Sequence, residues 1–291
     1  MAAIIVLFTD FGLEGPYTGQ VKTVLHQIAP GAPVVDLFAD LPAARPQPAA
    51  YLLAAYGGWF PPGTVILAVV DPGVGGERAA VVVEADSRWY VGPDNGLLEL
   101  VTRRAERTRS WEISARPEAI SASFHGRDLF APVAGLLARG DPPGGRLRPE
   151  GIFRRPDWPD DLPEIVYIDR FGNAMTGLRA RLISDGARLA AAGRVLARRR
   201  TFSDVSPGEP FWYENSNGLA EIAVNGGRAD SVLGLAIGTP VVVFALLLAA
   251  EVSDEMLGCG SVDPTDPDNY SAVTILNDTG QPVTSSPSYG V

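Results

Sequence analysis

The sequence predicts an α/β N-terminal domain with a mostly parallel, doubly wound sheet, followed by a small antiparallel β-barrel C-terminal domain. Two observations point to this organisation. In the first half of the chain, short apolar runs alternate with stretches whose apolar residues recur at helical spacing, which is typical of βαβ units. In the second half, short runs of strand-forming residues are separated by Gly, Asn and Pro turns, which indicates a small antiparallel barrel or sandwich.

The composition is that of an ordinary globular protein. The chain has 291 residues, a net charge of -10 and 46% hydrophobic residues, which is enough for two cores. Because binding to a nucleic-acid backbone needs a basic face, the acidic balance argues against a nucleic-acid partner. The single cysteine, Cys259, excludes an internal disulfide framework and a cysteine-based zinc site.

No stretch of the sequence points to a membrane. The longest apolar run, residues 241–250, is too short to cross a bilayer as a helix. The first predicted strand follows the initial residues directly, with no basic region or cleavage site before it. We therefore expect a cytoplasmic protein with no membrane partner.

The first half contains the alternating strands and helices. Each apolar run is bounded by Gly, Pro or Asp residues, which end strands and stop helices. The predicted strands cover residues 4–8, 34–37, 65–70, 80–84 and 89–91, and the predicted helices cover residues 19–29, 49–56, 97–104 and 129–138. The arginine-rich segments 103–109 and 194–200 are expected to be solvated faces of helices or hairpins.

The second half divides into three predicted parts. Residues 151–163 are rich in Pro, Arg and Asp and are predicted to link an α/β domain, residues 1–150, to a β-barrel domain, residues 164–244. The predicted strands of that domain cover residues 164–169, 194–201, 210–215, 219–225 and 240–244. Residues 245–291 carry no Lys or Arg and are rich in small polar residues, so we expect an acidic tail of low order.

The most informative segment follows the predicted strand 65–70. There an acid, Asp71, is followed by Pro72, three glycines and Arg78. Because ligands of open α/β sheets bind at the carboxyl ends of strands, Asp71 and Arg78 are candidates for chemistry. The alternative is that Asp71 is a turn residue and that the two side chains form a surface ion pair.

Histidine occurs at only two positions. His26 lies within the predicted helix 19–29, where a partly buried or surface residue is the simpler interpretation. His125 lies in the segment Ser-Phe-His-Gly-Arg-Asp just before the predicted helix 129–138. There it is expected to be exposed enough to titrate, and the positive end of the helix dipole makes its proton easier to lose. Asp128, in the same segment, is a candidate cap of that helix.

Three further segments carry polar residues at strand ends or in turns. Thr-Asp-Phe-Gly ends the first strand with Asp10. Asp-Arg-Phe-Gly-Asn, residues 169–173, and Asn-Ser-Asn-Gly, residues 215–218, would each pass singly as a hairpin turn.

Together, and in this order, these segments resemble the S-adenosylmethionine hydroxide adenosyltransferases, which are relatives of the fluorinase and chlorinase enzymes. The resemblance covers residues 4–244 and rests on Thr-Asp-Phe-Gly, Asp-Pro-Gly-Val-Gly, Gly-Pro-Asp-Asn-Gly, Phe-His-Gly-Arg-Asp and Asp-Arg-Phe-Gly-Asn. It implies S-adenosyl-L-methionine as substrate, no metal or organic cofactor, and a homotrimer. The substrate is then held between the N-terminal domain of one subunit and the C-terminal domain of its neighbour.

The resemblance also implies a catalytic triad. In hydrolytic members an Asp-Arg-His triad handles the attacking water, and these residues fall on Asp71, Arg78 and His125. Halogenating relatives carry an aromatic residue in place of Asp71, and the fluorinase carries a serine in place of Gly126 and a long insertion that is missing here. Since a carboxylate repels a halide, whereas attacking water must lose a proton, Asp71 favours hydrolysis. Arg78 and a protonated His125 are expected to favour hydroxide.

Substrate contacts follow from the same resemblance. Asp10 is expected to accept hydrogen bonds from both ribose hydroxyls, and Asp169 to pair with the methionine ammonium. Asn173 suits an adenine edge. Phe171, Met175 and Phe202 are expected to cover the ring faces, and Ser216, Glu221 and Val224 fall where the family contacts substrate. Met175 replaces a tryptophan of the fluorinase, and Asn217 replaces an arginine.

The expected activity is hydrolysis of S-adenosyl-L-methionine to adenosine and L-methionine, by attack of an activated water on ribose C5′. Two alternatives stay open. One is a halide-dependent 5′-halo-5′-deoxyadenosine synthase on the same fold. The other is a module that senses S-adenosylmethionine without turning it over.

Overall fold

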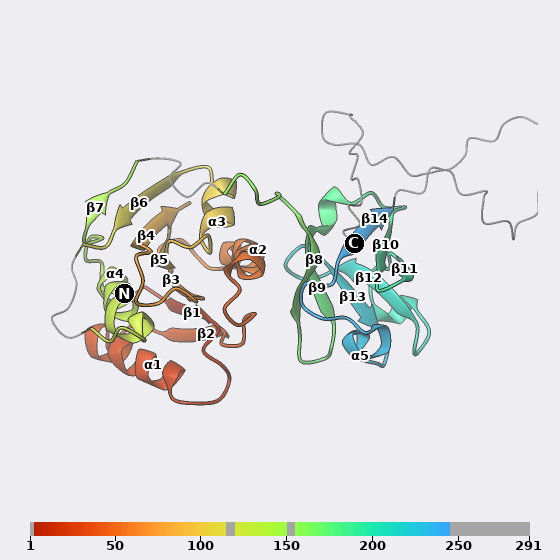
Figure 1. Ribbon diagram of the computed structural model, residues 1–291, viewed down its shortest axis with the longest axis horizontal. Coiled ribbons are helices and arrows are strands. Elements are labelled where there is room, and N and C mark those ends of the chain that lie inside the picture. Colours follow the sequence, from red (N-terminus) through yellow and green to blue (C-terminus); the bar gives the residue numbers. More distant parts are fainter. Residues whose placement is uncertain (1–2, 115–119, 150–154, 245–291) are drawn as a thin grey trace, which may run out of the picture. The chain divides into compact units, whose positions relative to one another are not determined.

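The computed structural model describes residues 3–114, 120–149 and 155–244 (Figure 1). These residues belong to one compact unit. The predicted tail, residues 245–291 with Cys259, lies outside the described residues.

A mixed seven-stranded sheet forms the N-terminal part of the chain. Its order is β2-β1-β3-β5-β4-β6-β7. Strands β2, β1, β3 and β5 run parallel, whereas β4, β6 and β7 join antiparallel. The strands are β1 (Ile5–Thr9), β2 (Val34–Phe38), β3 (Val65–Val69), β4 (Ala80–Ala85), β5 (Arg88–Pro93), β6 (Thr108–Glu112) and β7 (Arg146–Leu147).

The prediction of a mostly parallel sheet is therefore wrong for one side of the sheet. Only Asp86 and Ser87 connect β4 to β5, with φ angles of 45° and 64°. A connection of two residues can join only antiparallel strands, and positive φ at both positions is typical of a tight hairpin turn. Strand β6 was not predicted, and it then pairs antiparallel with β4 on the other side.

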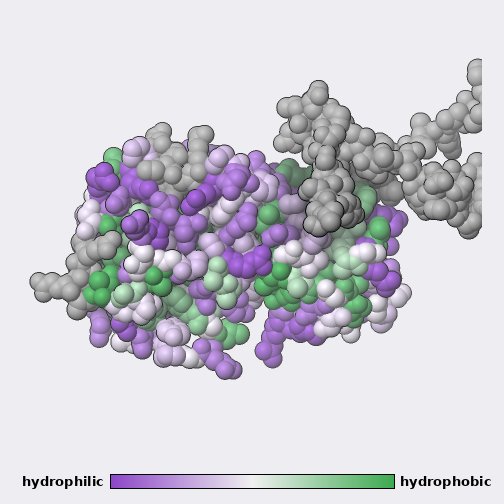
Figure 2. Space-filling model, viewed as in Figure 1, coloured by the Kyte–Doolittle hydropathy of each residue, from purple (hydrophilic) through white to green (hydrophobic). Residues whose placement is uncertain are grey.

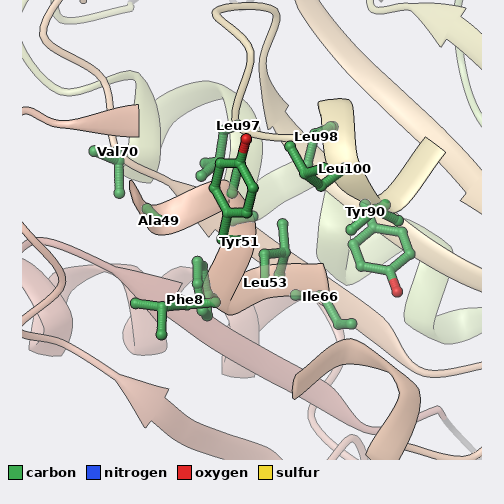
Figure 3. Packing of buried hydrophobic residues seen from close by; sticks show 14 of the residues in the cluster. Phe8, Ala49, Tyr51, Leu53, Ile66, Val70, Tyr90, Leu97, Leu98 and Leu100 are labelled. Atoms are coloured by element: carbon green, nitrogen blue, oxygen red, sulfur yellow. The ribbon is translucent and has the colours of Figure 1, made fainter. Parts of the chain in front are cut away.

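Helices lie against both faces of this sheet. They are α1 (Tyr17–Ile28), α2 (Pro46–Tyr56), α3 (Glu99–Arg104) and α4 (Ala131–Arg139). Successive side chains of β1 point to opposite faces. Ile5 and Leu7 pack in one core with residues of α1 and α4, and Phe8 packs in the other with residues of α2 and α3 (Figure 3). The strand ends between these two layers are thus held rigidly.

Two antiparallel sheets form the C-terminal part. The first has the order β12-β13-β9-β8 and the second the order β11-β10-β14. The strands are β8 (Leu162–Ile168), β9 (Ala174–Arg179), β10 (Arg188–Ala191), β11 (Arg194–Ala197), β12 (Pro210–Glu214), β13 (Leu219–Val224) and β14 (Val241–Phe244). Strands β9 and β10 were not predicted, and β8 begins at Leu162, inside the predicted linker.

The edges of these two sheets are linked by isolated bridges. Glu164 pairs with Pro240, and Arg198 pairs with Trp212. The Trp212 side chain is fully buried in the C-terminal core. Closure of the strands into one barrel remains a prediction, which these bridges support.

The described chain ranges contain no helix with the length and apolar character needed to cross a bilayer. Hydrophilic residues are spread over most of the visible face, with smaller groups of hydrophobic residues among them (Figure 2).

Candidate active site

Two carboxylates lie at the same edge of the N-terminal sheet. Strands β1 and β3 are parallel neighbours with Thr9 opposite Val69, so Asp10 and Asp71 follow strands that end side by side. The Asp10 Oδ2 atom accepts a 2.9 Å hydrogen bond from the backbone N–H of Ala44. Burial raises the pKa of Asp10 above its usual value of 3.8, the Ala44 hydrogen bond opposes this, and the charge of Asp71 raises the pKa further.

Arg78 turns back onto Asp71 from the far end of the loop that follows β3. Its Nε atom lies 3.0 Å from each carboxylate oxygen, and its Nη2 atom also donates to Oδ2. The two side chains are only 11% and 6% exposed. The alternative of a surface ion pair is therefore wrong, because this forked pair is largely buried.

A glycine allows this loop to approach the segment before His125. Gly75 has a φ of +80°, and a Cβ atom built there would lie 2.4 Å from the carbonyl oxygen of Ala122. Only glycine combines this backbone conformation with such a close approach. The loop from Asp71 to Arg78 is thereby brought against the segment that carries the histidine.

His125 completes a chain of hydrogen bonds. Its Nδ1 atom lies 2.8 Å from Nη2 of Arg78. The residue is only 6% exposed, so the expectation of an exposed histidine is wrong. Asp128 makes no side-chain cap; instead it accepts hydrogen bonds from the backbone of Ser121 and from Arg127. His26 is exposed on α1, in agreement with its interpretation as a surface residue.

A second group of predicted residues lines one cavity in the C-terminal part. The cavity has a volume of about 670 Å³. Its lining includes five of the predicted substrate contacts, namely Asp169, Phe171, Asn173, Phe202 and Val224. The structure therefore brings these five together, and Phe171 is 74% exposed at this site.

The Asp-Arg-Phe-Gly-Asn segment is also the hairpin turn between β8 and β9. Asp169 accepts hydrogen bonds from the backbone of Asn173 at 2.9 Å and from its side-chain Nδ2 at 3.1 Å. Gly172, with a φ of +84°, makes the turn. The turn therefore holds Asp169 and Asn173 at the cavity in a fixed relation.

Four predicted contacts do not line this cavity: Asp10, at the edge of the N-terminal sheet, and three residues of the C-terminal part. Glu221 is buried and accepts hydrogen bonds from Tyr213 at 2.6 Å and from Asn215 at 2.8 Å, and burial raises its pKa. Met175 lies opposite Glu221 in the sheet, and its sulfur accepts a 3.5 Å hydrogen bond from Tyr56. The Ser216 hydroxyl accepts a 3.1 Å hydrogen bond from its neighbour Asn217.

Sequence reasoning missed Tyr213, which lines the cavity. Its ring packs with Phe202 and Phe211, with centroid distances of 5.4 and 5.7 Å. Alternation along Phe-Trp-Tyr in the predicted strand 210–215 places Phe211 and Tyr213 on the face opposite Trp212. That alternation was the available signal.

Within residues 3–114, 120–149 and 155–244, no cluster of three or more His, Cys, Asp or Glu side chains is arranged to hold a metal ion.

The fold and the sheet-edge site define an α/β protein joined to an antiparallel β part, with polar groups gathered after parallel strands. Two family models match this chain: the SAM hydroxide adenosyltransferase N-terminal domain over residues 5–145 and the C-terminal domain of the same family over residues 163–242. The chain belongs to the SAM hydroxide adenosyltransferase family.

Individual relatives agree with this assignment. A Thermus thermophilus protein named (R)-S-adenosyl-L-methionine hydrolase is 44% identical over 253 residues, which cover 81% of this chain and 98% of the relative. A fluorinase from Actinopolyspora mzabensis is more distant, at 26% identity over 76% of this chain and 90% of its own. The crystal structure of an uncharacterized conserved protein from Thermotoga maritima superposes with a TM-score of 0.74 at 32% identity, covering 82% of this chain and 99% of that one.

Proposed function

We propose that this protein hydrolyses S-adenosyl-L-methionine to adenosine and L-methionine. The observation that carries the proposal is the buried chain of hydrogen bonds from Asp71 through Arg78 to His125, at the sheet edge that also holds Asp10. Related proteins that share most of the chain are named for this hydrolysis. The proposal thus combines a built site with a family assignment.

The reaction needs a positioned water more than it needs a better leaving group. The water oxygen forms a bond to ribose C5′, the bond from C5′ to sulfur breaks, and its electron pair leaves with the sulfur as the neutral thioether of methionine. The proton lost by the water passes to solvent. Because the sulfonium already leaves readily, the barrier lies in holding water in line with that bond and in taking up its proton. We therefore propose that no metal or organic cofactor is required.

Arg78 is the group that we assign to the water oxygen. A guanidinium carries five N–H donors, and those on Nε and Nη2 serve Asp71 and His125. Nη1 has no hydrogen bond to any residue in the described ranges, so its two donors are available to the oxygen as negative charge develops there. The Oδ1 atom of Asp71, which accepts from Nε alone, has acceptor capacity left for a hydrogen of the same water.

The state of His125 follows from its partner. A guanidinium donates and never accepts, so the Nδ1 atom that faces Arg78 is the acceptor and the ring proton resides on Nε2. The imidazole is then neutral in this arrangement and donates through Nε2. We propose this neutral form for the resting site, in place of the protonated His125 that the resemblance led us to expect.

Substrate binding is proposed for two groups of residues. Asp10 accepts the ribose hydroxyls, Asp169 pairs with the ammonium group, and Asn173 contacts the adenine edge. The ring faces are covered by Phe171, Phe202 and Met175, and the remaining contacts come from Ser216, Glu221 and Val224. The shared cavity supports the assignment for five of these residues.

We also propose a homotrimer whose sites are completed by a neighbouring subunit, and a cytoplasmic location. Large apolar side chains are exposed near both groups of site residues: Leu13 is 79% exposed shortly after Asp10, and Phe171 is 74% exposed at the cavity. A contact between subunits would cover such side chains. Analytical ultracentrifugation tests the assembly, and a monomeric species with full activity would contradict it.

The activity test supplies each sulfonium epimer of S-adenosylmethionine separately, in ¹⁸O-labelled water, with EDTA and with or without chloride or fluoride. We expect adenosine and methionine in equal amounts, independent of halide, with the label in the 5′-hydroxyl of adenosine. His26→Ala is a matched control for His125→Ala, because His26 is the other histidine of the chain and is exposed on α1. A halogenated nucleoside, or tight binding without any adenosine, would overturn the proposal.

A further inference from the structure

Phe130 lies against the guanidinium of Arg78. The Arg78 Cζ atom is 5.3 Å from the centroid of the Phe130 ring, within the range of a cation–π interaction. The Phe130 side chain is fully buried, in the core formed with α1 and α4. The Phe130 ring is therefore held in a fixed position beside the guanidinium of Arg78.

The contacts to Asp71 and His125 do not by themselves hold the guanidinium still. Both partners bind Nε and Nη2, which form one edge of the planar group. A guanidinium held only along this edge can still tilt about it. The Phe130 ring stabilises one orientation of the guanidinium, and with it the direction in which Nη1 presents its donors.

The backbone places Phe130 there by means of an unusual turn. Residues Gly126–Phe130 form a π-helix, in which the N–H of Ala131 bonds the carbonyl of Gly126. With bonds from i to i+5, His125 and Phe130 lie one turn apart on the same face. In an α-helix, at 3.6 residues per turn, residue i+5 is rotated by about 140° from residue i. The π-turn thus allows the histidine and the phenylalanine to contact one arginine.

We propose that Phe130 is a positioning residue of the hydrolytic site, acting through the guanidinium of Arg78. This inference rests on the proposed function, because it takes Arg78 as the group that holds the water. Phe130 is then required for its ring electrons as well as for its volume, which distinguishes it from an ordinary core phenylalanine.

The test replaces Phe130 with 4-fluoro-, 3,5-difluoro- and 3,4,5-trifluorophenylalanine in the full chain. These residues keep the ring shape while progressively weakening the negative face of the ring. We expect kcat to fall in steps, reaching about 3-fold to 30-fold below wild type, with KM unchanged within about twofold. Trifluorophenylalanine at Phe8, another fully buried ring, is the matched control and should leave kcat unchanged.

A second measurement does not depend on turnover. With only two histidines in the chain, the ¹⁵N signals of the His125 ring can be assigned by comparison with His26→Ala. Wild type should show Nδ1 without a proton, and fluorination at Phe130 should increase the tautomer with the proton on Nδ1, because Arg78 then donates to it less consistently.

Phe130→Leu is the second variant, and it should shift the tautomer in the same direction as the trifluoro ring. If wild type forms no adenosine, the proposed function fails and the tautomer measurement alone decides the role of Phe130. Values of kcat and tautomer populations that do not depend on the fluorine number, or equal losses for the Phe8 control, would overturn the inference.

Discussion

The Nη2 atom of Arg78 lies 2.8 Å from Nδ1 of His125, two residues that are 47 positions apart in the chain. The contact also determines which nitrogen of the His125 ring carries the proton. Because the arginine can only donate, a proton on Nδ1 would remove the hydrogen bond and place two donors face to face. The pair therefore couples the protonation of the histidine to the orientation of the arginine.

Replacing His125 separates these two roles. His125→Ala removes the acceptor for Arg78 and the Nε2 donor, so kcat should fall at least about 100-fold. In His125→Asn the side-chain oxygen falls near the position of Nδ1 and still accepts from Arg78, so we expect it to recover about tenfold of that loss. Steady-state kinetics measure both, with His26→Ala as control. Wild-type kcat in His125→Ala would remove the histidine from the reaction.

Replacing Arg78 with lysine keeps the positive charge and removes the paired N–H donors of the guanidinium. A single ammonium cannot satisfy both oxygens of Asp71 and also reach His125, so Arg78→Lys should lower kcat about 100-fold and destabilise the fold by roughly 1–3 kcal/mol. Kinetics and denaturant unfolding report the two effects. A fully active lysine variant would show that charge alone suffices.

The loop that joins Asp71 to Arg78 offers a matched pair of glycines. Gly75→Ala places a Cβ at a φ of +80° and 2.4 Å from the Ala122 carbonyl, so the loop must move away from the His125 segment. We expect about 1–2 kcal/mol lower stability and a larger loss of kcat than of substrate affinity.

Gly73→Ala is the control in the same loop. Its Cβ would meet the side chain of Arg78 at an ordinary 3.7 Å, and kcat should stay within about twofold of wild type. Equal effects of the two substitutions would contradict the role of Gly75.

Much of the N-terminal sheet could be predicted because its strands are defined by their own residues. Strand β3 matches its predicted range within one residue, since its residues are all apolar and bounded by turn formers. Strand β6, with the sequence Thr-Arg-Ser-Trp-Glu, has only Ser110 buried and therefore shows no apolar pattern. It is a strand because β4 offers it an edge, which local sequence does not encode.

The candidate site likewise contains residues that local sequence could predict and one that it could not. Asp71 and Arg78 could be singled out because each lies at a strand end in a glycine-rich loop. Phe130 could not, since a buried phenylalanine beside a helix looks like any core residue. Its contact with Arg78 depends on the π-turn at Gly126–Phe130, and the sequence carried no recognised signal for that turn.

Asp10→Asn tests the binding of ribose, because the substitution should raise the free energy of unfolding and lower the affinity for adenosine. Burial raises the pKa of Asp10, so the folded chain holds this proton more tightly than the unfolded chain does. The contribution of Asp10 to stability is therefore fully present below pH 3.8 and is lost as pH rises through the raised pKa. At pH 7 asparagine, which still accepts the Ala44 N–H, should give a higher free energy of unfolding, and this advantage should shrink as pH falls.

Affinity should respond in the opposite direction. Ionised Asp10 accepts both ribose hydroxyls, so the variant should bind adenosine at least about tenfold more weakly at pH 7. Wild-type affinity should fall on acidification through the raised pKa, while the affinity of the variant stays level. Calorimetric binding of adenosine and urea unfolding between about pH 3 and 7 measure the two curves. If the variant bound adenosine as tightly as wild type at pH 7, Asp10 would have no contact with the ribose, because the amide replaces one of the two acceptor oxygens of the carboxylate with an NH2 donor.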